Sequence, residues 1–142
     1  MLETQFSHTF TSEQPKVSQA VKGAVSWLRE RGVEEGAAAS IEIAMAEALN
    51  NVVEHGYAFC ENGQIDISLD LVDAVLRLAI RDQGKKFPGI PQKKEMHGDA
   101  VAFENLPEGG FGWFLIHSLT RRIDYAFLDD KNVLFLEFDA PQ

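Results

Sequence analysis

The sequence contains little cysteine and little positive charge, and both shortages exclude functions. Cys60 is the only cysteine among the 142 residues, so the chain can form neither an internal disulfide nor a cysteine-based metal cluster. Asp and Glu outnumber Lys and Arg by 22 to 13, which gives a net charge of -9. General nucleic-acid binding depends on neutralising phosphates with basic side chains, so this composition argues against it. Binding of one nucleotide needs only local donors and is compatible with an acidic chain.

Long apolar runs and repeats are also missing. No apolar run approaches the roughly 18 residues of a membrane-spanning helix, and the first residues lack a basic segment followed by an apolar core. There is no internal repeat and no low-complexity tract. With 45% hydrophobic residues, we expect one cytoplasmic domain over residues 1–142, without a membrane partner.

The spacing of apolar residues predicts an α+β fold. Alternation predicts strands over residues 6–10, 65–71, 75–81, 122–128 and 132–138. Helical spacing predicts helices over residues 15–31, 34–55 and 113–119. This order favours a two-layer α/β sandwich, in which helices cover one face of a largely antiparallel mixed sheet.

A polar stripe marks the helix expected over residues 34–55. Glu47, Asn51 and His55 are four residues apart and therefore point to the same side. The apolar residues of this helix share a narrow face that we expect to face the core: Ile41, Met45, Ala48 and Val52. The stripe is either a solvated helix face with a capping histidine or a functional cluster.

A second feature, Asp82-Gln83-Gly84, stands where a buried strand is expected to end. Such an aspartate can accept a hydrogen bond from an exocyclic amine, and the glycine lets the backbone pass close to a ligand. Asp-X-Gly is also a common turn, so this feature alone decides nothing.

A third feature, Gly109-Gly110-Phe111-Gly112, runs directly into a predicted helix. Backbone N–H groups at a helix start can hold phosphate oxygens. The segment is not a P-loop, because the Lys-Ser/Thr pair that ends one is absent. Between the second and third features the chain loses periodicity, and so long a connection is usually functional or disordered.

The ordered set of motifs resembles the GHKL ATPase superfamily: Glu47-x-x-x-Asn51-x-x-x-His55-Gly56, then Asp82-x-Gly84, then Gly109-Gly110-x-Gly112-x-x-Leu115-Ile116. Within it, the chain is most similar to the small stand-alone anti-sigma-factor serine/threonine kinases. The resemblance covers nearly the whole chain and implies an ATP site in a sandwich of the Bergerat, or histidine-kinase-like, type.

The resemblance also implies roles for the polar stripe and the strand end. Asn51 would bind Mg²⁺, and Glu47 would act as the general base for the attacking hydroxyl. Asp82 would hydrogen-bond the adenine amine, with Gly84 allowing close approach. His55 is expected to pack at the helix end beside the nucleotide rather than to act in catalysis.

The glycine segment would then bind the ATP phosphates through Gly109, Gly110, Phe111 and Gly112. Residues 83–111 would form the lid over ATP. One departure from the superfamily is Lys86, which stands where many members have a second glycine of the first glycine box. Because Phe87-Pro88 follows, as in many of the small members, we interpret Lys86 as a variant of this branch.

The function implied is an ATP- and Mg²⁺-dependent serine/threonine kinase that phosphorylates an anti-anti-sigma (STAS-like) partner and regulates a sigma factor by partner switching. The alternative is a module that binds ATP only to shape a surface for a protein partner. A sensor histidine kinase is disfavoured, since no helix pair with a phospho-accepting histidine precedes the motifs. The resemblance implies a homodimer, and Phe6 and Phe10 of the first strand are candidate contacts.

Overall fold

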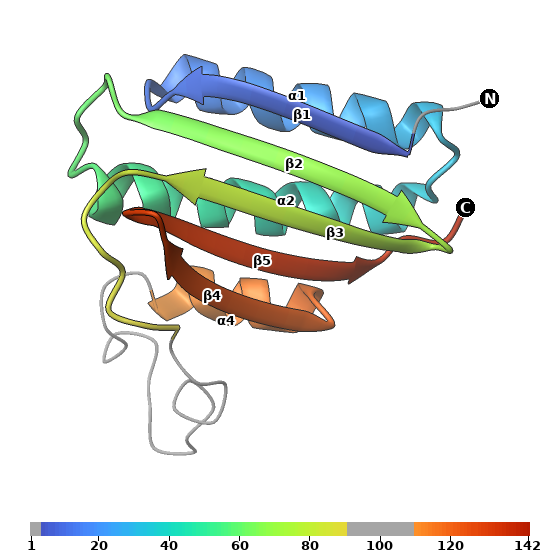
Figure 1. Ribbon diagram of the computed structural model, residues 1–142. Coiled ribbons are helices and arrows are strands. Elements are labelled where there is room, and N and C mark those ends of the chain that lie inside the picture. The colour runs from blue at the N-terminus through green and yellow to red at the C-terminus, as the bar shows by residue number, and fades with distance from the viewer. Residues whose placement is uncertain (1–3, 91–109) are drawn as a thin grey trace.

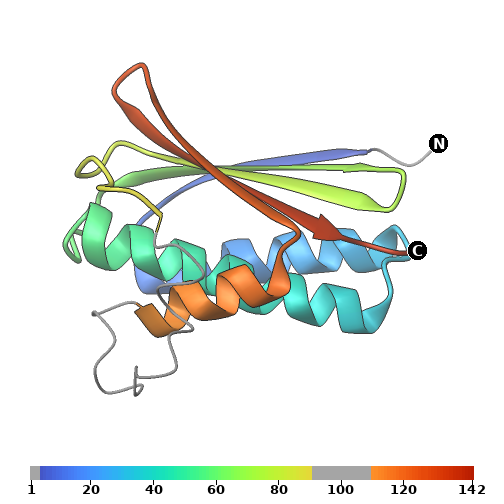
Figure 2. The ribbon, with the colours of Figure 1, turned by 90° about the horizontal axis from the view of Figure 1, so that it is seen from below.

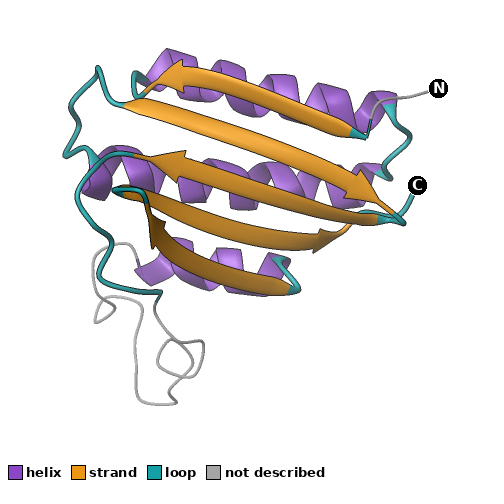
Figure 3. Ribbon diagram, viewed as in Figure 1, coloured by secondary structure: helices purple, strands orange, loops and turns teal. Residues whose placement is uncertain are grey.

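The computed structural model describes residues 4–90 and 110–142, so most of the expected lid lies outside the described residues. Its elements are β1 (Gln5–Thr11), α1 (Gln14–Glu30), α2 (Glu35–Asn51), the π-helical turn η1 (Val52–Gly56), β2 (Gln64–Val72), β3 (Val75–Asp82), α4 (Gly110–Leu119), β4 (Arg122–Leu128) and β5 (Lys131–Asp139) (Figures 1 and 3). In these residues no helix is both long enough and apolar enough to cross a membrane.

The strands form a single antiparallel sheet in the order β1-β2-β3-β5-β4. Two of its hairpins close through pairs of residues with positive φ: Asp73 and Ala74 between β2 and β3, and Asp129 and Asp130 between β4 and β5. Two-residue turns of this kind match the twist of paired strands. The expected antiparallel sheet is confirmed, and all of its described pairings are antiparallel.

The helices cover one face of this sheet, with α2 between α1 and α4 (Figure 2). Alternate residues of β2 and β3 point into this layer, and seven of them are at most 5% exposed: Ile65, Ile67, Leu69, Leu71, Leu76, Leu78 and Ile80. The predicted core face of α2 is fully buried as well, with Ile41 and Met45 at 0% exposure. The two-layer sandwich predicted from the sequence is therefore confirmed.

Phe6 and Phe10 of β1 also point toward the helices. The ring of Phe6 lies 5.8 Å from that of Trp27 on α1, and Phe10 is 7% exposed. Both side chains thus belong to the core side of the sheet, with Phe10 buried and Phe6 partly buried, and their contact with a second molecule stays a prediction.

The second helix differs from its prediction at its end. The expected helix over residues 34–55 runs as α2 to Asn51 and then widens into the turn η1, where the Tyr57 N–H donates to the carbonyl of Val52 at 2.9 Å. Wide turns of this type occur mostly as single turns, often at functional sites. The turn ends at Gly56, whose carbonyl accepts the N–H of Lys85 at 2.8 Å.

Candidate functional site

The predicted site residues meet at one end of the molecule. There α2 and β3 end and α4 begins, as Figures 1 and 2 both show. Asp82 is the last residue of β3, Asn51 is the last residue of α2, and Gly110 is the first residue of α4. Motifs that lie far apart in the sequence are therefore brought to a common edge of the sandwich.

Asp82 points into the core side at the end of its strand and is only 6% exposed. Its Oδ1 accepts the Gly84 N–H at 2.9 Å and the Nδ2–H of Asn132 at 3.0 Å. Burial raises the pKa of the carboxyl, while these two hydrogen bonds lower it. Both described hydrogen bonds end on one oxygen, so the second oxygen can accept a donor from a ligand.

Two glycines allow the backbones of η1 and the β3 end to touch. A Cβ on Gly84 would lie 2.5 Å from the carbonyl oxygen of Gly56, a distance that no side chain tolerates. A Cβ on Gly56 would lie 3.4 Å from Asp82 Oδ1, which is much less restrictive. The Asp-X-Gly motif is thus more than a turn, because Gly84 lets the strand end press against the end of the helical segment.

Glu47 and Asn51 lie one turn apart on α2 and therefore share a side of the helix. Within the described residues, Asn51 Nδ2 is the only buried side-chain nitrogen or oxygen without a hydrogen-bond partner. A buried amide group without a partner costs free energy, because it has lost its hydrogen bond to water and has gained none within the protein. The unpartnered Nδ2 is a donor, so an acceptor on a ligand, such as a phosphate oxygen, would satisfy it, whereas a metal ion would bind the amide through Oδ1.

The start of α4 adjoins the same helix. A Cβ on Gly112 would lie 2.8 Å from Glu47 Oε2, so the start of α4 lies directly against this carboxylate, although the flexible glutamate side chain could move aside for a small residue. Gly110 opens the helix, whereas Gly109 lies outside the described residues. The described part of the predicted glycine segment therefore lies next to Glu47, and the backbone N–H groups at the start of α4 are donors that a phosphate group could use.

His55 lies beyond the end of α2, in the η1 turn. The imidazole is exposed, and its Nε2 lies 3.9 Å from Glu54 Oε2. Its expected place beside a nucleotide stays a prediction.

The sequence analysis missed Asn132, Tyr125 and Tyr57. Asn132 is the first inward-facing residue of β5, on the side that Leu134, Leu136 and Phe138 continue, and it pairs in register with Asp82. A polar residue within an apolar stripe was a signal available in the sequence. The Tyr57 hydroxyl accepts the Gln83 N–H at 2.7 Å and donates to the Gln64 carbonyl at 2.5 Å, so it ties the loop after η1 to the first residue of β2 and to the residue that follows β3.

The described residues hold no cluster of three or more His, Cys, Asp or Glu side chains that could bind a metal ion. A Mg²⁺ ion at Asn51 would therefore need most of its ligands from phosphates and water, as is usual for this ion. The unpartnered Nδ2 donor of Asn51 fits a phosphate oxygen, and Oδ1 of the same amide would be the ligand that this residue offers to the ion.

Comparison with known proteins identifies the family of this chain. Residues 10–138 match the family model described as histidine kinase-like ATPase domain. Serine-protein kinase RsbW of Oceanobacillus iheyensis is 35% identical over 81 residues, which are 56% of this chain and 51% of that protein. The RsbW of Staphylococcus epidermidis is 35% identical over 85 residues, 58% of this chain and 54% of that protein. The matched regions thus span about half the length of these curated relatives.

Solved structures share the fold across almost the whole chain. The crystal structure of the RsbU and RsbW domains of Rv1364c from Mycobacterium tuberculosis has a TM-score of 0.69 at 18% identity, and covers 99% of this chain and 33% of that one. The catalytic domain of the histidine kinase ThkA has a TM-score of 0.52 at 12% identity, covering 96% of this chain and 99% of that one. At such low sequence identities, these two structures show a shared fold and nothing more.

Proposed function

Because the chain belongs to the histidine kinase-like ATPase domain family, we propose that it binds Mg-ATP at the α2–β3–α4 edge and transfers the γ-phosphoryl group to a serine or threonine of a protein partner. The observation that carries this proposal is that the site has two chemically different ends. A buried carboxylate suited to a base amine lies at the β3 end, while Glu47 lies beside the start of α4 and the unsatisfied Asn51 is one turn further along α2.

The roles follow from the chemistry of each group. Asp82 accepts the exocyclic amine of adenine, and the glycine contact between η1 and the β3 end gives the flat base room to approach. Asn51 and the first N–H groups of α4 bind the phosphate end. Mg²⁺, when bound, neutralises charge on the phosphates.

Glu47 is the proposed general base. It is one turn from Asn51 and touches the first turn of α4, so it can reach a hydroxyl that approaches the terminal phosphate. A partner serine or threonine hydroxyl would give its proton to this carboxylate as its oxygen bonds to phosphorus and ADP leaves. Positioning and charge stabilisation supply most of the acceleration in such reactions.

The proposed partners come from the resemblance to the anti-sigma kinases. We expect a STAS-like anti-anti-sigma protein as the phosphorylated partner and a sigma factor as the regulated one. The names of the relatives, serine-protein kinase RsbW, support serine as the acceptor. ATP and these partners together favour the cytoplasm as the place of action.

Calorimetric titration with Mg-ATP tests the site. We expect the native protein to bind, and the Asp82→Asn and Asn51→Ala variants to bind about 10- to 100-fold more weakly, the effect of losing a charge-assisted contact. Glu61→Gln, an exposed change in the loop before β2, serves as the matched control and should bind as the native protein does. No binding by folded native protein would overturn the ATP site.

A transfer assay then separates a kinase from a nucleotide-gated binding module. Native protein is mixed with labelled ATP and candidate STAS-domain proteins of the same organism. Label on a partner serine or threonine supports the kinase, whereas ATP-dependent complex formation without label would favour the binding module.

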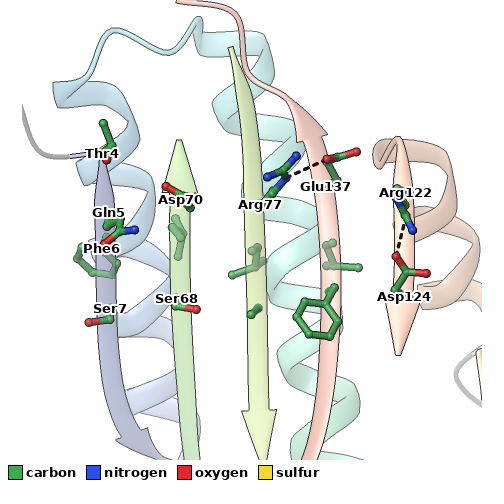
Figure 4. Close-up of a pocket in the computed structure, with 15 residues that line it drawn as sticks. Thr4, Gln5, Phe6, Ser7, Ser68, Asp70, Arg77, Arg122, Asp124 and Glu137 are labelled. Atoms are coloured by element: carbon green, nitrogen blue, oxygen red, sulfur yellow. Dashed lines mark hydrogen bonds and ion pairs between the residues drawn. The ribbon is translucent and has the colours of Figure 1, made fainter. Parts of the chain in front are cut away.

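We also propose a homodimer formed by the outer face of the sheet, which no described helix covers. Across this face the paired strands place alternating charges in one row, Asp70, Arg77, Glu137 and Arg122 (Figure 4). A two-fold axis parallel to the strands, between β3 and β5, would reverse the row in the second copy. Asp70 would then face Arg122, and Arg77 would face Glu137, so opposite charges meet throughout.

Sedimentation of charge variants tests this dimer. Arg77→Glu would place like charges opposite each other and should shift the protein toward monomer. The double variant Arg77→Glu/Glu137→Arg exchanges the two charges and should restore the dimer. A native protein that sediments as a monomer would overturn the proposed dimer. That result would not affect the proposed ATP site.

A further inference from the structure

Asn132 is a buried polar side chain that belongs to none of the motifs found in the sequence. It is 5% exposed at the start of β5, directly opposite Asp82 in the β3–β5 register. A carboxamide in such a place is costly unless each of its donors and acceptors is satisfied. Its partners therefore indicate why it is there.

The nitrogen of Asn132 faces acceptors only. Nδ2 donates to Asp82 Oδ1 at 3.0 Å, and it also faces the carbonyl oxygens of Lys85 at 3.1 Å and Gly84 at 3.4 Å. A carboxylate and two carbonyls can only accept, so the chemistry of the partners fixes which end of the amide lies here.

The oxygen of Asn132 faces donors only. Oδ1 accepts the backbone N–H of Phe87 at 2.9 Å and the hydroxyl of Tyr125 at 2.5 Å. The side chain thus spans three segments of the chain: the end of β3, the residues that follow it, and β4. A shorter or apolar residue could not join these three.

One consequence concerns the orientation of Asp82. The bonds from Asn132 and from the Gly84 N–H both end on Oδ1, so they hold the carboxylate plane from one side. This leaves Oδ2 as the acceptor for a ligand. An acceptor held in a fixed direction favours a ligand that offers an N–H at that point and disfavours one that offers a carbonyl oxygen.

A second consequence concerns the chain that leaves β3. The Phe87 ring lies 5.4 Å from the ring of Trp113 on α4 and 5.4 Å from that of Tyr125 on β4. Because Asn132 holds the Phe87 N–H and the Tyr125 hydroxyl, it also fixes this aromatic cluster. The base-binding carboxylate and the start of α4 are therefore parts of one connected structure.

We propose that Asn132 is a positioning residue that orients Asp82 and the backbone of residues 84–87, and that through them it makes the site select a 6-aminopurine over a 6-oxopurine. The inference rests on the proposed ATP site and adds the residue that sets its base preference. Asn132 acts through Asp82 and does not itself touch the base.

The test compares Mg-ATP with Mg-ITP, whose base carries a carbonyl in place of the amine. The native protein should bind Mg-ATP more tightly. In Asn132→Ala the freed carboxylate can turn, so binding of Mg-ATP should weaken by about tenfold or more while that of Mg-ITP changes little. A loss that is equal for both nucleotides would mean a structural role alone and would overturn the inference.

Tyr125→Phe is the matched control, because it removes one hydrogen bond to Asn132 and keeps the ring in the aromatic cluster. Its preference for Mg-ATP should stay within about threefold of the native value, since the contact between Asn132 and Asp82 is retained. If Tyr125→Phe lost the preference as fully as Asn132→Ala, the assignment to Asn132 would be wrong.

Asn132→Asp adds a readout that a structural role would not produce. A protonated carboxyl can donate to Asp82 Oδ1 as the amide does, whereas two ionised carboxylates repel. Mg-ATP affinity relative to native protein should therefore fall as the pH is raised. The Tyr57 phenol, whose pKa is raised mainly by burial and also by the Asp82 charge, stays neutral over this range. A ratio that does not change with pH would contradict the proposed contact.

The outcomes separate this inference from the function on which it rests. If native protein binds neither nucleotide, the ATP site fails. If native protein prefers Mg-ATP and Asn132→Ala keeps the same preference, only the positioning role fails.

Discussion

The two halves of the candidate site are built in opposite ways. At the β3 end, Asp82 and Asn132 are buried and hydrogen-bonded, and Gly84 lies against Gly56. At the α2–α4 side, Asn51 keeps a buried amide nitrogen without a partner beside the Glu47 carboxylate. In the first half the polar groups already have hydrogen-bond partners within the protein, whereas the second half keeps a donor that a ligand could satisfy. If ATP binds as proposed, its base would meet a rigid frame, and the substrate would complete the reacting end.

The largest expected effect distinguishes the two halves of the site, because one half should govern the rate of phosphoryl transfer and the other the affinity for Mg-ATP. Glu47→Gln should lower phosphoryl transfer by about 10²- to 10⁴-fold, the usual contribution of a general base. Affinity for Mg-ATP should change little, since the amide has nearly the same shape as the carboxylate. Asp82→Asn should have the opposite effect: it should weaken Mg-ATP binding more than it lowers the rate of phosphoryl transfer from bound ATP. Transfer by Glu47→Gln at the native rate would remove Glu47 from its assigned role.

The next effect tests the rigidity of the β3 end. Gly84→Ala should lower the free energy of unfolding by about 1–3 kcal/mol, because the methyl group would strike the Gly56 backbone. Gly36→Ala on α2 is the control, with open space around its Cβ, and it should raise stability slightly as a helical alanine. Thermal unfolding measures both. Equal stability of Gly84→Ala and native protein would show that the two backbones can move apart.

The smallest effect concerns the titration of Asp82. Burial raises its folded pKa above the ordinary value of 3.8, so between these two values the folded state holds more protons than the unfolded state. Stability from this group is therefore present at low pH and is lost as the pH rises through the folded pKa.

Asp82→Asn does not titrate at this position and serves as the reference. The free energy of unfolding of native protein, minus that of Asp82→Asn, should fall as the pH is raised from about 4 to about 7. Denaturant unfolding at several pH values measures this difference. A rising difference would mean that the hydrogen bonds from Asn132 and Gly84 outweigh burial.

The sequence predicted the sheet and helices well because burial on one face leaves a period of two or of 3.6 residues. The roles expected for Glu47, Asn51 and Asp82 came from the order of the motifs and the family that they resemble, and these roles stay predictions. Asn132 could not be assigned in this way, since its role depends on the register that places it opposite Asp82. Register is a property of paired strands and does not follow from one strand alone.

Two other differences have similar physical causes. The wide turn η1 leaves no mark in the spacing of apolar residues, because Val52 and Val53 are buried as they would be in an α-helix. The alternation of Phe6 and Phe10 shows that they share a face, but the contact with Trp27 that buries Phe6 comes from a different element. Periodicity therefore predicts which residues share a face of an element more reliably than it predicts which other element packs against that face.

The unpaired amide of Asn51 has a consequence for how long the protein lasts in a cell. A fold that leaves a donor unsatisfied gains stability by mass action from whatever completes it. With ligand at 100 times its dissociation constant, this gain is about 2.7 kcal/mol for a single site. The survival of the folded chain against proteolysis would then follow the supply of nucleotide, so that the protein's abundance responds to the energy state of the cell.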